Sequence, residues 1–265
     1  VFNSECERIE LNQGRVSGVR LASGDSLRAD SLVFNGDIAA LRKGLLGPGL
    51  QKSVPGKVQA RSLSALTWSM HADTRGMSLD RHNVFFNSDY ASEFDDIFAH
   101  QRMPLQPTVY VCAQDRGTGT APAGAERLLC LVNAPARGDK HMSDDELQAC
   151  ARSSQARMEN AGLHLSLESS ASCIRTTPQD FHQLFPATGG ALYGQATHGW
   201  MAAFARSNAR SQAQGLYLAG GSVHPGPGVP MAAMSGQLAA AALMADLGLT
   251  SQWRPTVTSG GTLTH

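Results

Sequence analysis

The residues with the clearest potential for chemistry lie near the C-terminal end of the 265-residue sequence, in Leu216-Tyr-Leu-Ala-Gly-Gly-Ser-Val-His-Pro-Gly-Pro-Gly-Val-Pro-Met231. The pattern predicts an apolar strand at 216–219, a loop at 220–230 and an alanine-rich helix at 231–247. A glycine-rich loop before a helix presents free backbone N–H groups and the positive end of the helix dipole. The segment therefore predicts a site for an electron-rich or anionic group, although an ordinary strand-to-helix turn has the same local pattern.

Two better-defined motifs are not complete in this segment. Gly220 to His224 begins like the G-x-S-x-G turn of a serine hydrolase, but His224 stands where the second glycine is needed. Gly226-Pro-Gly228 lacks the third glycine and the downstream acid of a dinucleotide fingerprint, and no G-x-x-x-x-G-K-[ST] occurs. His224 is the nearest candidate for a catalytic base, yet a histidine in such a loop is more often a hydrogen-bonding residue.

Composition and charge exclude several functions. Lys plus Arg and Asp plus Glu both number 22, so no net field attracts nucleic acid, and a nucleic-acid partner is not expected. The five cysteines form no C-x-x-C and the histidines show no ligand spacing, so neither a disulfide framework nor a metal site is predicted. Residues 217–245 contain no Asp, Glu, Lys or Arg, but His224, three prolines and several glycines interrupt the stretch, so no membrane span is expected.

The elements that must position the loop begin with a β meander. Strands are predicted at 6–11, 15–21, 26–29 and 31–35, followed by a helix from Asp37 to Leu46 that ends at Gly47-Pro48-Gly49. Leu32-Val33-Phe34 is typical of a central parallel strand that is buried on both faces.

The middle of the chain is predicted to be a mixed sheet backed by helices. Ser88 and Ser143 are expected to cap two of these helices, the second of which ends at Gly162. A solvated loop is expected at 117–125 and a loose polar tail at 251–265. The predicted strands of this block are 62–70, 83–86, 108–113, 128–133 and 166–175.

Three segments together resemble the FAD-dependent carotenoid desaturases of the phytoene desaturase type, within the amine-oxidoreductase superfamily. They are Gly14-Arg-Val-Ser-Gly-Val-Arg-Leu-Ala-Ser-Gly-Asp25, Ala29-Asp-Ser-Leu-Val-Phe-Asn-Gly-Asp37 and the loop already described, in which His224 to Pro230 matches the H-P-G-x-G-V/I-P signature of that family.

Further segments are most similar to the bacterial 1-hydroxycarotenoid 3,4-desaturases, also known as methoxyneurosporene dehydrogenases. They are Asn83-Val-Phe-Phe-Asn-Ser-Asp-Tyr90, Pro107-Thr-Val-Tyr-Val-Cys-Ala-Gln-Asp-Arg116 and Leu184-Phe-Pro-Ala-Thr-Gly-Gly-Ala-Leu-Tyr-Gly-Gln195. The family begins with a G-x-G-x-x-G unit, which this sequence does not contain, so we expect only the C-terminal part of such an enzyme. Val1 inside an apparent strand, with no Met, supports the same expectation.

The resemblance implies an α/β fold: the C-terminal part of a two-domain, FAD-linked amine-oxidoreductase-like fold with a mixed α+β substrate domain inserted in the FAD domain. The expected divisions are 1–45 and 206–248 for the FAD domain, 46–205 for the substrate domain and 249–265 for a flexible tail.

The implied function is FAD-dependent desaturation of an acyclic hydroxylated or methoxylated carotenoid. The implied partners are that carotenoid, the missing N-terminal part and a membrane surface, with the enzyme cytoplasmic and peripheral on the inner or intracytoplasmic membrane of a bacterium. Another superfamily activity, amine oxidation or polyene isomerisation, and a non-catalytic isoprenoid-binding fragment remain alternatives.

The resemblance also implies roles for individual residues around FAD. Gly220, Gly221 and Ser222 would face the ribityl chain, and the backbone of residues 228–231 would approach the flavin pyrimidine edge. Asn35 and Gly36 would line the same cleft, and the backbone of Cys6 would pair with adenine. The candidate cofactor-binding residues are thus Asn35, Gly36, Gly220, Gly221, Ser222, Gly228, Val229, Pro230 and Met231.

Overall fold

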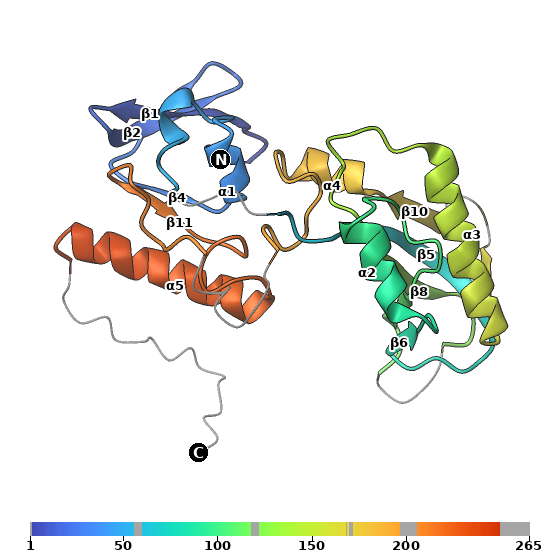
Figure 1. Ribbon diagram of the computed structural model, residues 1–265. Helices are drawn as coiled ribbons and strands as arrows, with labels where there is room; N and C mark the ends of the chain where they lie inside the picture. Colours follow the sequence, from blue (N-terminus) through green and yellow to red (C-terminus); the bar gives the residue numbers. More distant parts are fainter. Residues whose placement is uncertain are drawn as a thin grey trace.

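The computed structural model describes residues 2–55, 60–117, 122–167, 169, 172–196 and 206–249, and its elements form two lobes (Figure 1). The α5 lobe combines the N-terminal strands with the C-terminal helix. The sheet lobe holds the middle of the chain. Residues 118–121 of the predicted loop and 250–265 of the predicted tail lie outside the described part.

The α5 lobe begins with the predicted meander of three antiparallel strands. Gln13 and Gly14 both have positive φ, 51° and 80°, in the turn between the first two strands. The strands are β1 (Cys6–Asn12), β2 (Arg15–Leu21) and β3 (Ser26–Arg28), which confirms the sequence prediction.

A parallel strand pair forms the centre of this lobe. β4 (Leu32–Phe34) pairs in parallel with β11 (Leu216–Leu218), although more than 180 residues separate them. Both strands and the parallel character of β4 were predicted, but their pairing with each other was not. The predicted burial of β4 on both faces was wrong, because Val33 is 47% exposed. Within the described residues, β4 has a neighbour on one edge only.

Two helices flank this pair. α1 (Ile38–Arg42) starts at its predicted cap, Asp37, but ends before Leu46 because Lys43 and Gly44 close it in a tight turn. The short 3₁₀ helix η1 (Pro48–Leu50) follows. α5 (Val229–Asp246) starts two residues before the predicted Met231 and packs on β11. Its buried positions are Ser235, Ala239 and Ala242, whose small side chains permit a close approach.

The sheet lobe is built on one antiparallel sheet in the order β10-β5-β8-β7-β6, with β9 also paired to β5. The prediction of a single strand at 166–175 was wrong. β9 and β10 are separate strands, and they pair with different stretches of the long strand β5. The strands are β5 (Ser64–Gly76), β6 (His82–Phe85), β7 (Val109–Ala113), β8 (Glu126–Ala134), β9 (Leu163–Leu167) and β10 (Cys173–Thr176).

Helix α3 (Asp144–Asn160) covers one face of this sheet. Leu147, Cys150 and Met158 of α3 join the main apolar core with Val111 and Val132 of the sheet. Ser143 caps α3 as predicted. α2 (Tyr90–Phe98) is capped by Asp89 and not by Ser88, and α4 (Pro178–Leu184) was not predicted.

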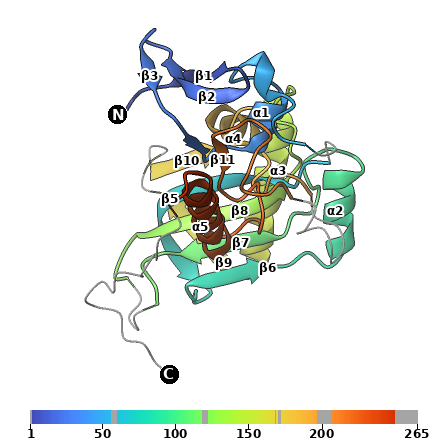
Figure 2. The same cartoon turned by 90° about the vertical axis from the view of Figure 1, so that its left-hand side faces the viewer.

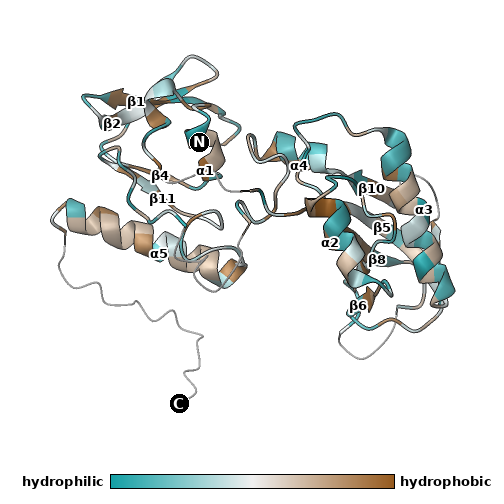
Figure 3. Ribbon diagram, viewed as in Figure 1, coloured by the Kyte–Doolittle hydropathy of each residue, from teal (hydrophilic) through white to brown (hydrophobic). Residues whose placement is uncertain are grey.

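α5 lies on the side of the sheet opposite to α3, and its N-terminal end points toward the sheet lobe (Figures 1 and 2). α5 is apolar along most of its length (Figure 3), yet Val229 is 85% exposed and Met234 is 47% exposed. No helix of the described part is long and apolar enough to cross a bilayer. The described residues also contain no group of three metal-ligating side chains.

Candidate functional site

The predicted site residues meet where the two parallel strands end. Asn35 and Gly36 follow β4, and Gly220 and Gly221 follow β11 in the same direction. A Cβ on Gly220, whose φ is 112°, would lie 2.9 Å from Oδ1 of Asn35. Ligands of α/β proteins bind at the carboxyl ends of parallel strands, so the fold brings this part of the predicted set to a suitable edge.

The loop after β11 is tied to the elements on both sides of it. Ser222 Oγ accepts a hydrogen bond from the backbone N–H of Ile38 at 3.3 Å. The N–H of Gly220 donates to Ser235 Oγ at 2.7 Å, and this hydroxyl donates to the carbonyl of Ala232. The strand ends, the loop and α5 therefore form one hydrogen-bonded unit.

The first turn of α5 leaves its N-terminal end open. Gly228 precedes the helix with φ 103°, and no described side chain caps it. A Cβ built on Gly228 meets nothing within 4 Å, while Val229 and Met231 are exposed. Free N–H groups of a first turn, together with the helix dipole, favour an electron-rich partner. This arrangement is the one that the glycine pattern predicted.

Arg206 holds the loop after β11 in place, and this role was not predicted from the sequence. Its side chain is buried and donates to the carbonyls of Gly221 at 3.0 Å, Tyr193 at 3.1 Å and Gln195 at 3.3 Å. Burial lowers the pKa of Arg206, although nearby Asp37 opposes this change. Arg206 joins the loop after β11 to the segment after α4, and no local sequence motif marks such a residue.

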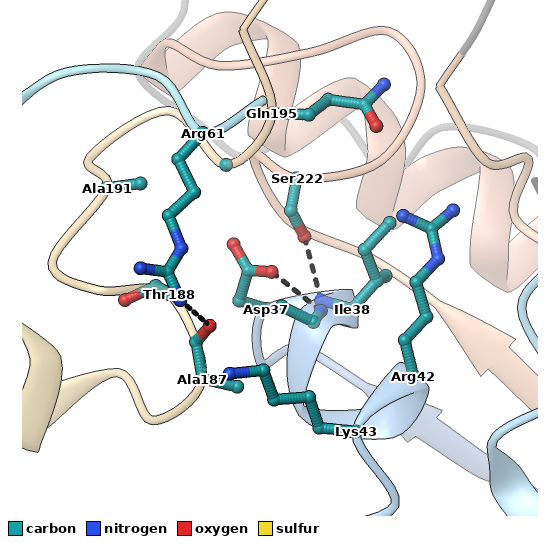
Figure 4. A pocket seen from close by; sticks show the side chains of 12 residues that line it. Asp37, Ile38, Arg42, Lys43, Arg61, Ala187, Thr188, Ala191, Gln195 and Ser222 are labelled. Atoms are coloured by element: carbon teal, nitrogen blue, oxygen red, sulfur yellow. Dashed lines mark hydrogen bonds between the residues drawn. The ribbon is translucent and has the colours of Figure 1, made fainter. Parts of the chain in front are cut away.

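A pocket of about 160 Å³ lies between the two lobes, beside Ser222 (Figure 4). Asp37 and Arg42 line it from the α5 lobe, and Arg61 and Thr188 line it from the sheet lobe. Burial raises the pKa of Asp37, whose carboxylate also caps α1. Burial lowers the pKa of Arg42. Acidic and basic side chains therefore both line this pocket.

Arg61, which lines the pocket from the sheet lobe, is held by four hydrogen bonds. Its guanidinium makes two bonds of 2.7 Å to the carboxylate of Asp139 and also donates to the carbonyls of Ala136 and Ala187. The hydrogen bonds from Arg61 lower the pKa of Asp139 to about 2.

This depressed pKa predicts a measurable dependence of stability on pH. The ionised pair stabilises the fold fully above the ordinary aspartate pKa of 3.8, and the stabilisation is lost as the pH falls toward about 2. We expect Asp139→Asn to lower the free energy of unfolding by about 1–2 kcal/mol at pH 6, and roughly half of that difference to be lost at pH 3. Urea unfolding of the parent and Asp139→Asn at pH 6 and pH 3 measures this difference in free energy. An equal difference at the two pH values would contradict the depressed pKa of Asp139.

A larger cavity of about 860 Å³ opens on the other side of the strand ends. Cys6 of β1 lines it together with Asn35 and Gly36, so the three predicted residues of the N-terminal segment share one cavity. Phe185 closes part of it from the sheet lobe. His224 is not among the residues that line these two cavities, and its backbone N–H donates to the carbonyl of Ser207 at 2.9 Å.

The parallel pair, the glycine loop and the open helix start define a cofactor-binding α/β protein with an added antiparallel sheet domain. The chain belongs to the family described as flavin containing amine oxidoreductase, whose sequence profile matches residues 1–244. The mixed α/β fold expected from the sequence is confirmed.

Curated relatives narrow this family further. The chain is 56% identical over 267 aligned positions to the hydroxyneurosporene desaturase of Rubrivivax gelatinosus, and 42% identical over 252 positions to that of Cereibacter sphaeroides. These alignments cover 100% and 95% of the chain but 51% and 50% of the relatives, so the chain spans about half of their length. A solved oxidoreductase from Methanosarcina mazei is 14% identical with a TM-score of 0.46, covering 91% of this chain and 49% of that one.

Proposed function

We propose that this chain is the part of an FAD-dependent desaturase that acts on an acyclic hydroxylated or methoxylated carotenoid. The observation that carries the proposal is the 56% identity to a hydroxyneurosporene desaturase, which extends over the whole chain and includes both lobes. The flavin-containing family supports the cofactor, and the open start of α5 supports its position.

The residues at the strand ends fit a flavin nucleotide. Gly220, Gly221 and Ser222 would hold the ribityl chain, and the backbone of residues 228–231 would hold the pyrimidine edge. The space above Gly228, where a Cβ meets nothing within 4 Å, supports the second assignment. The cavity shared by Cys6, Asn35 and Gly36 supports placement of the adenosine part there.

The chain's own contribution to the reaction is positioning and electrostatics. Bound flavin supplies the two-electron oxidant for removing hydrogen from adjacent carbons. The N–H groups at the start of α5 would hold the pyrimidine edge of the flavin and would stabilise negative charge there. Arg206 and Ser235 hold these groups in place through Gly221 and Gly220. No catalytic base is assigned, and His224 is proposed only as a loop residue.

We propose the domain division expected from the sequence, with FAD-binding segments at 1–45 and 206–248 and a substrate domain at 46–205. We also propose that a further N-terminal segment, which carries the G-x-G-x-x-G unit, completes the flavin site. The edge of β4 that pairs with no described strand, the exposed Val33 and the exposed apolar side chains of α5 support a neighbour at this place. Apolar side chains that gather on one face of a helix or strand are normally covered in a folded domain.

A chimera tests the proposed function directly. In it, this chain replaces the matching half of the Rubrivivax gelatinosus relative. The chimera is expected to convert hydroxyneurosporene to a product with one more double bond, as detected by chromatography and absorbance. An inactive chimera beside an active parent enzyme would refute the function, and carotenoid binding without conversion would favour the non-catalytic alternative.

We propose that the enzyme binds a membrane surface through an aromatic stripe formed by Phe86, Tyr90, Phe94 and Phe98. Successive rings lie 6.0, 5.0 and 6.3 Å apart between centroids, and Phe86 is 65% exposed. Aromatic rings are favoured at the lipid–water interface, and a carotenoid substrate resides in lipid. The stripe therefore suits a peripheral enzyme on the inner or intracytoplasmic membrane.

Replacing both Phe86 and Phe98 by serine should lower binding of the chimera to liposomes about tenfold, because two exposed rings would no longer leave water. Co-sedimentation with phosphatidylglycerol and phosphatidylethanolamine vesicles measures this change. Leu249→Ser, at another exposed apolar position, is the control and should bind as the parent does. Equal binding by all three proteins would exclude the stripe as the contact.

A further inference from the structure

The sheet face opposite to α3 has an unusual composition. Residues along a strand point alternately to the two faces, so Leu129 and Leu131 lie opposite to the buried Leu128, Cys130 and Val132. The strand registers align the residues of this second face in rows that cross five strands. One row consists of Val84, Tyr110, Leu131, Thr67 and Thr176, and the next of His82, Cys112, Leu129, Ser69 and Ile174.

Neither row contains Lys, Arg, Asp or Glu. A sheet face turned toward water normally carries polar and charged side chains, yet Ile174 is 67% exposed and Val84 is 46% exposed here. Five strands at about 4.8 Å spacing give each row a length of roughly 19 Å. Two rows of this length without a charged side chain suit an extended, neutral ligand, and this face lies on the α5 side of the sheet (Figure 2).

A hydrogen-bonded ring pair stands at one end of this face. Nδ1 of His82 lies 2.7 Å from the hydroxyl oxygen of Tyr110, and the two rings stack with centroids 6.1 Å apart. Burial and the neighbouring Cys112 raise the pKa of Tyr110, so its hydroxyl stays protonated at neutral pH. Cys112, Leu131 and Val84 face the pair from the adjacent strands, and none of them is Asp, Glu, Lys or Arg. Arg81 acts on the pKa of Tyr110 in the opposite sense to burial.

The phenol oxygen of Tyr110 keeps one free hydrogen-bonding group, whether Tyr110 donates to Nδ1 of His82 or Nδ1 donates to Tyr110. If Tyr110 donates to Nδ1, its oxygen can still accept from an alcohol. If Nδ1 carries the proton and donates to Tyr110, the phenol O–H is free to donate to an alcohol or an ether oxygen. The pair therefore suits one oxygen atom on an otherwise apolar ligand.

We propose that the Tyr110–His82 pair binds the hydroxyl or methoxyl oxygen of the carotenoid and so makes the enzyme specific for oxygenated substrates, while Leu129, Leu131 and the other uncharged residues of the two rows support the polyene. This inference rests on the proposed function and adds the residues that select the substrate. When a carotenoid covers the face, water is excluded, and a carotene without the oxygen leaves the pair without its partner. A site built in this way rejects the analogue that lacks the oxygen.

The test compares kcat/KM of the chimera for hydroxyneurosporene and for the same carotene without the hydroxyl. Tyr110→Phe removes one oxygen atom and keeps the ring, so the fold is retained. It should lower the preference for the hydroxylated substrate at least tenfold, through a lower kcat/KM for that substrate alone. Tyr193→Phe, a hydroxyl on an exposed ring outside the two rows, is the matched control and should keep the preference.

A second pair of variants separates the hydrogen bond from the shape of His82. His82→Gln can still bond to Tyr110 and should retain more of the preference than His82→Leu. An unchanged preference in Tyr110→Phe would overturn the inference and leave the proposed function intact. Loss of activity in the unsubstituted chimera, with the parent enzyme active, would instead refute the proposed function.

Discussion

Replacing Arg206 by methionine will lower the thermal midpoint of the chimera by roughly 6 °C or more. Methionine has a similar length but donates no hydrogen bond, so the carbonyls of Gly221, Tyr193 and Gln195 lose their partner. A buried acceptor without a partner costs about 1–3 kcal/mol, and because the three bonds of Arg206 are only partly buried, we expect their combined loss to cost about 3 kcal/mol. For a domain of this size, each kcal/mol corresponds to about 2–4 °C.

Arg127→Met is the matched control, because Arg127 pairs with Asp115 at an exposed position. An exposed ion pair contributes little, so this variant should melt within about 2 °C of the parent. Differential scanning calorimetry compares the three proteins. If Arg206→Met melts as Arg127→Met does, Arg206 does not hold the loop.

Gly228→Val should raise the dissociation constant of FAD from the apo chimera at least about a hundredfold. Its new side chain would occupy the open space at the start of α5 where we place the pyrimidine edge. A hundredfold change corresponds to about 2.7 kcal/mol, which displacement of the ring from the N–H groups can account for. Because φ at Gly228 is 103°, the substitution also strains the apo fold by about 1–3 kcal/mol.

Gly248→Val separates this strain from the loss of the site. Gly248 also has a positive φ, 70°, and a Cβ there also meets nothing within 4 Å, but it follows the far end of α5. Fluorescence titration with FAD should show parental affinity for Gly248→Val and weak binding for Gly228→Val. Equal affinities in the two variants would mean that Gly228 only shapes a turn.

The local elements of this fold were predictable because their signals are local. The turn at Gln13 and Gly14, the Ser143 cap and the glycine loop before α5 each follow from residues close in sequence. The meander, the two strands that form the parallel pair and the position of the loop were therefore predicted correctly, whereas the pairing of these two distant strands was not predicted. The start of α5 was predicted two residues late, because Val229 and Pro230 are compatible with either a loop or a first helical turn.

The errors arose where distant parts of the chain decide the outcome. The exposure of Val33 depends on which strand lies beside β4, and the division of 166–175 depends on the length of β5. Arg206 bonds to carbonyls from two different loops, so no spacing in the sequence reveals it. The Tyr110–His82 pair depends on the register between β6 and β7, which the alternation within one strand does not determine.

The flavin content of the purified chimera tests the central claim most directly, namely that this chain supplies one side of an FAD site through the loop after β11 and the start of α5. Absorbance between 350 and 500 nm, followed by release and chromatography of the cofactor, measures occupancy. We predict close to one FAD per chimera and loss of most of it in Gly228→Val but not in Gly248→Val. A folded chimera that binds no flavin, while the parent Rubrivivax enzyme binds it, would contradict the claim.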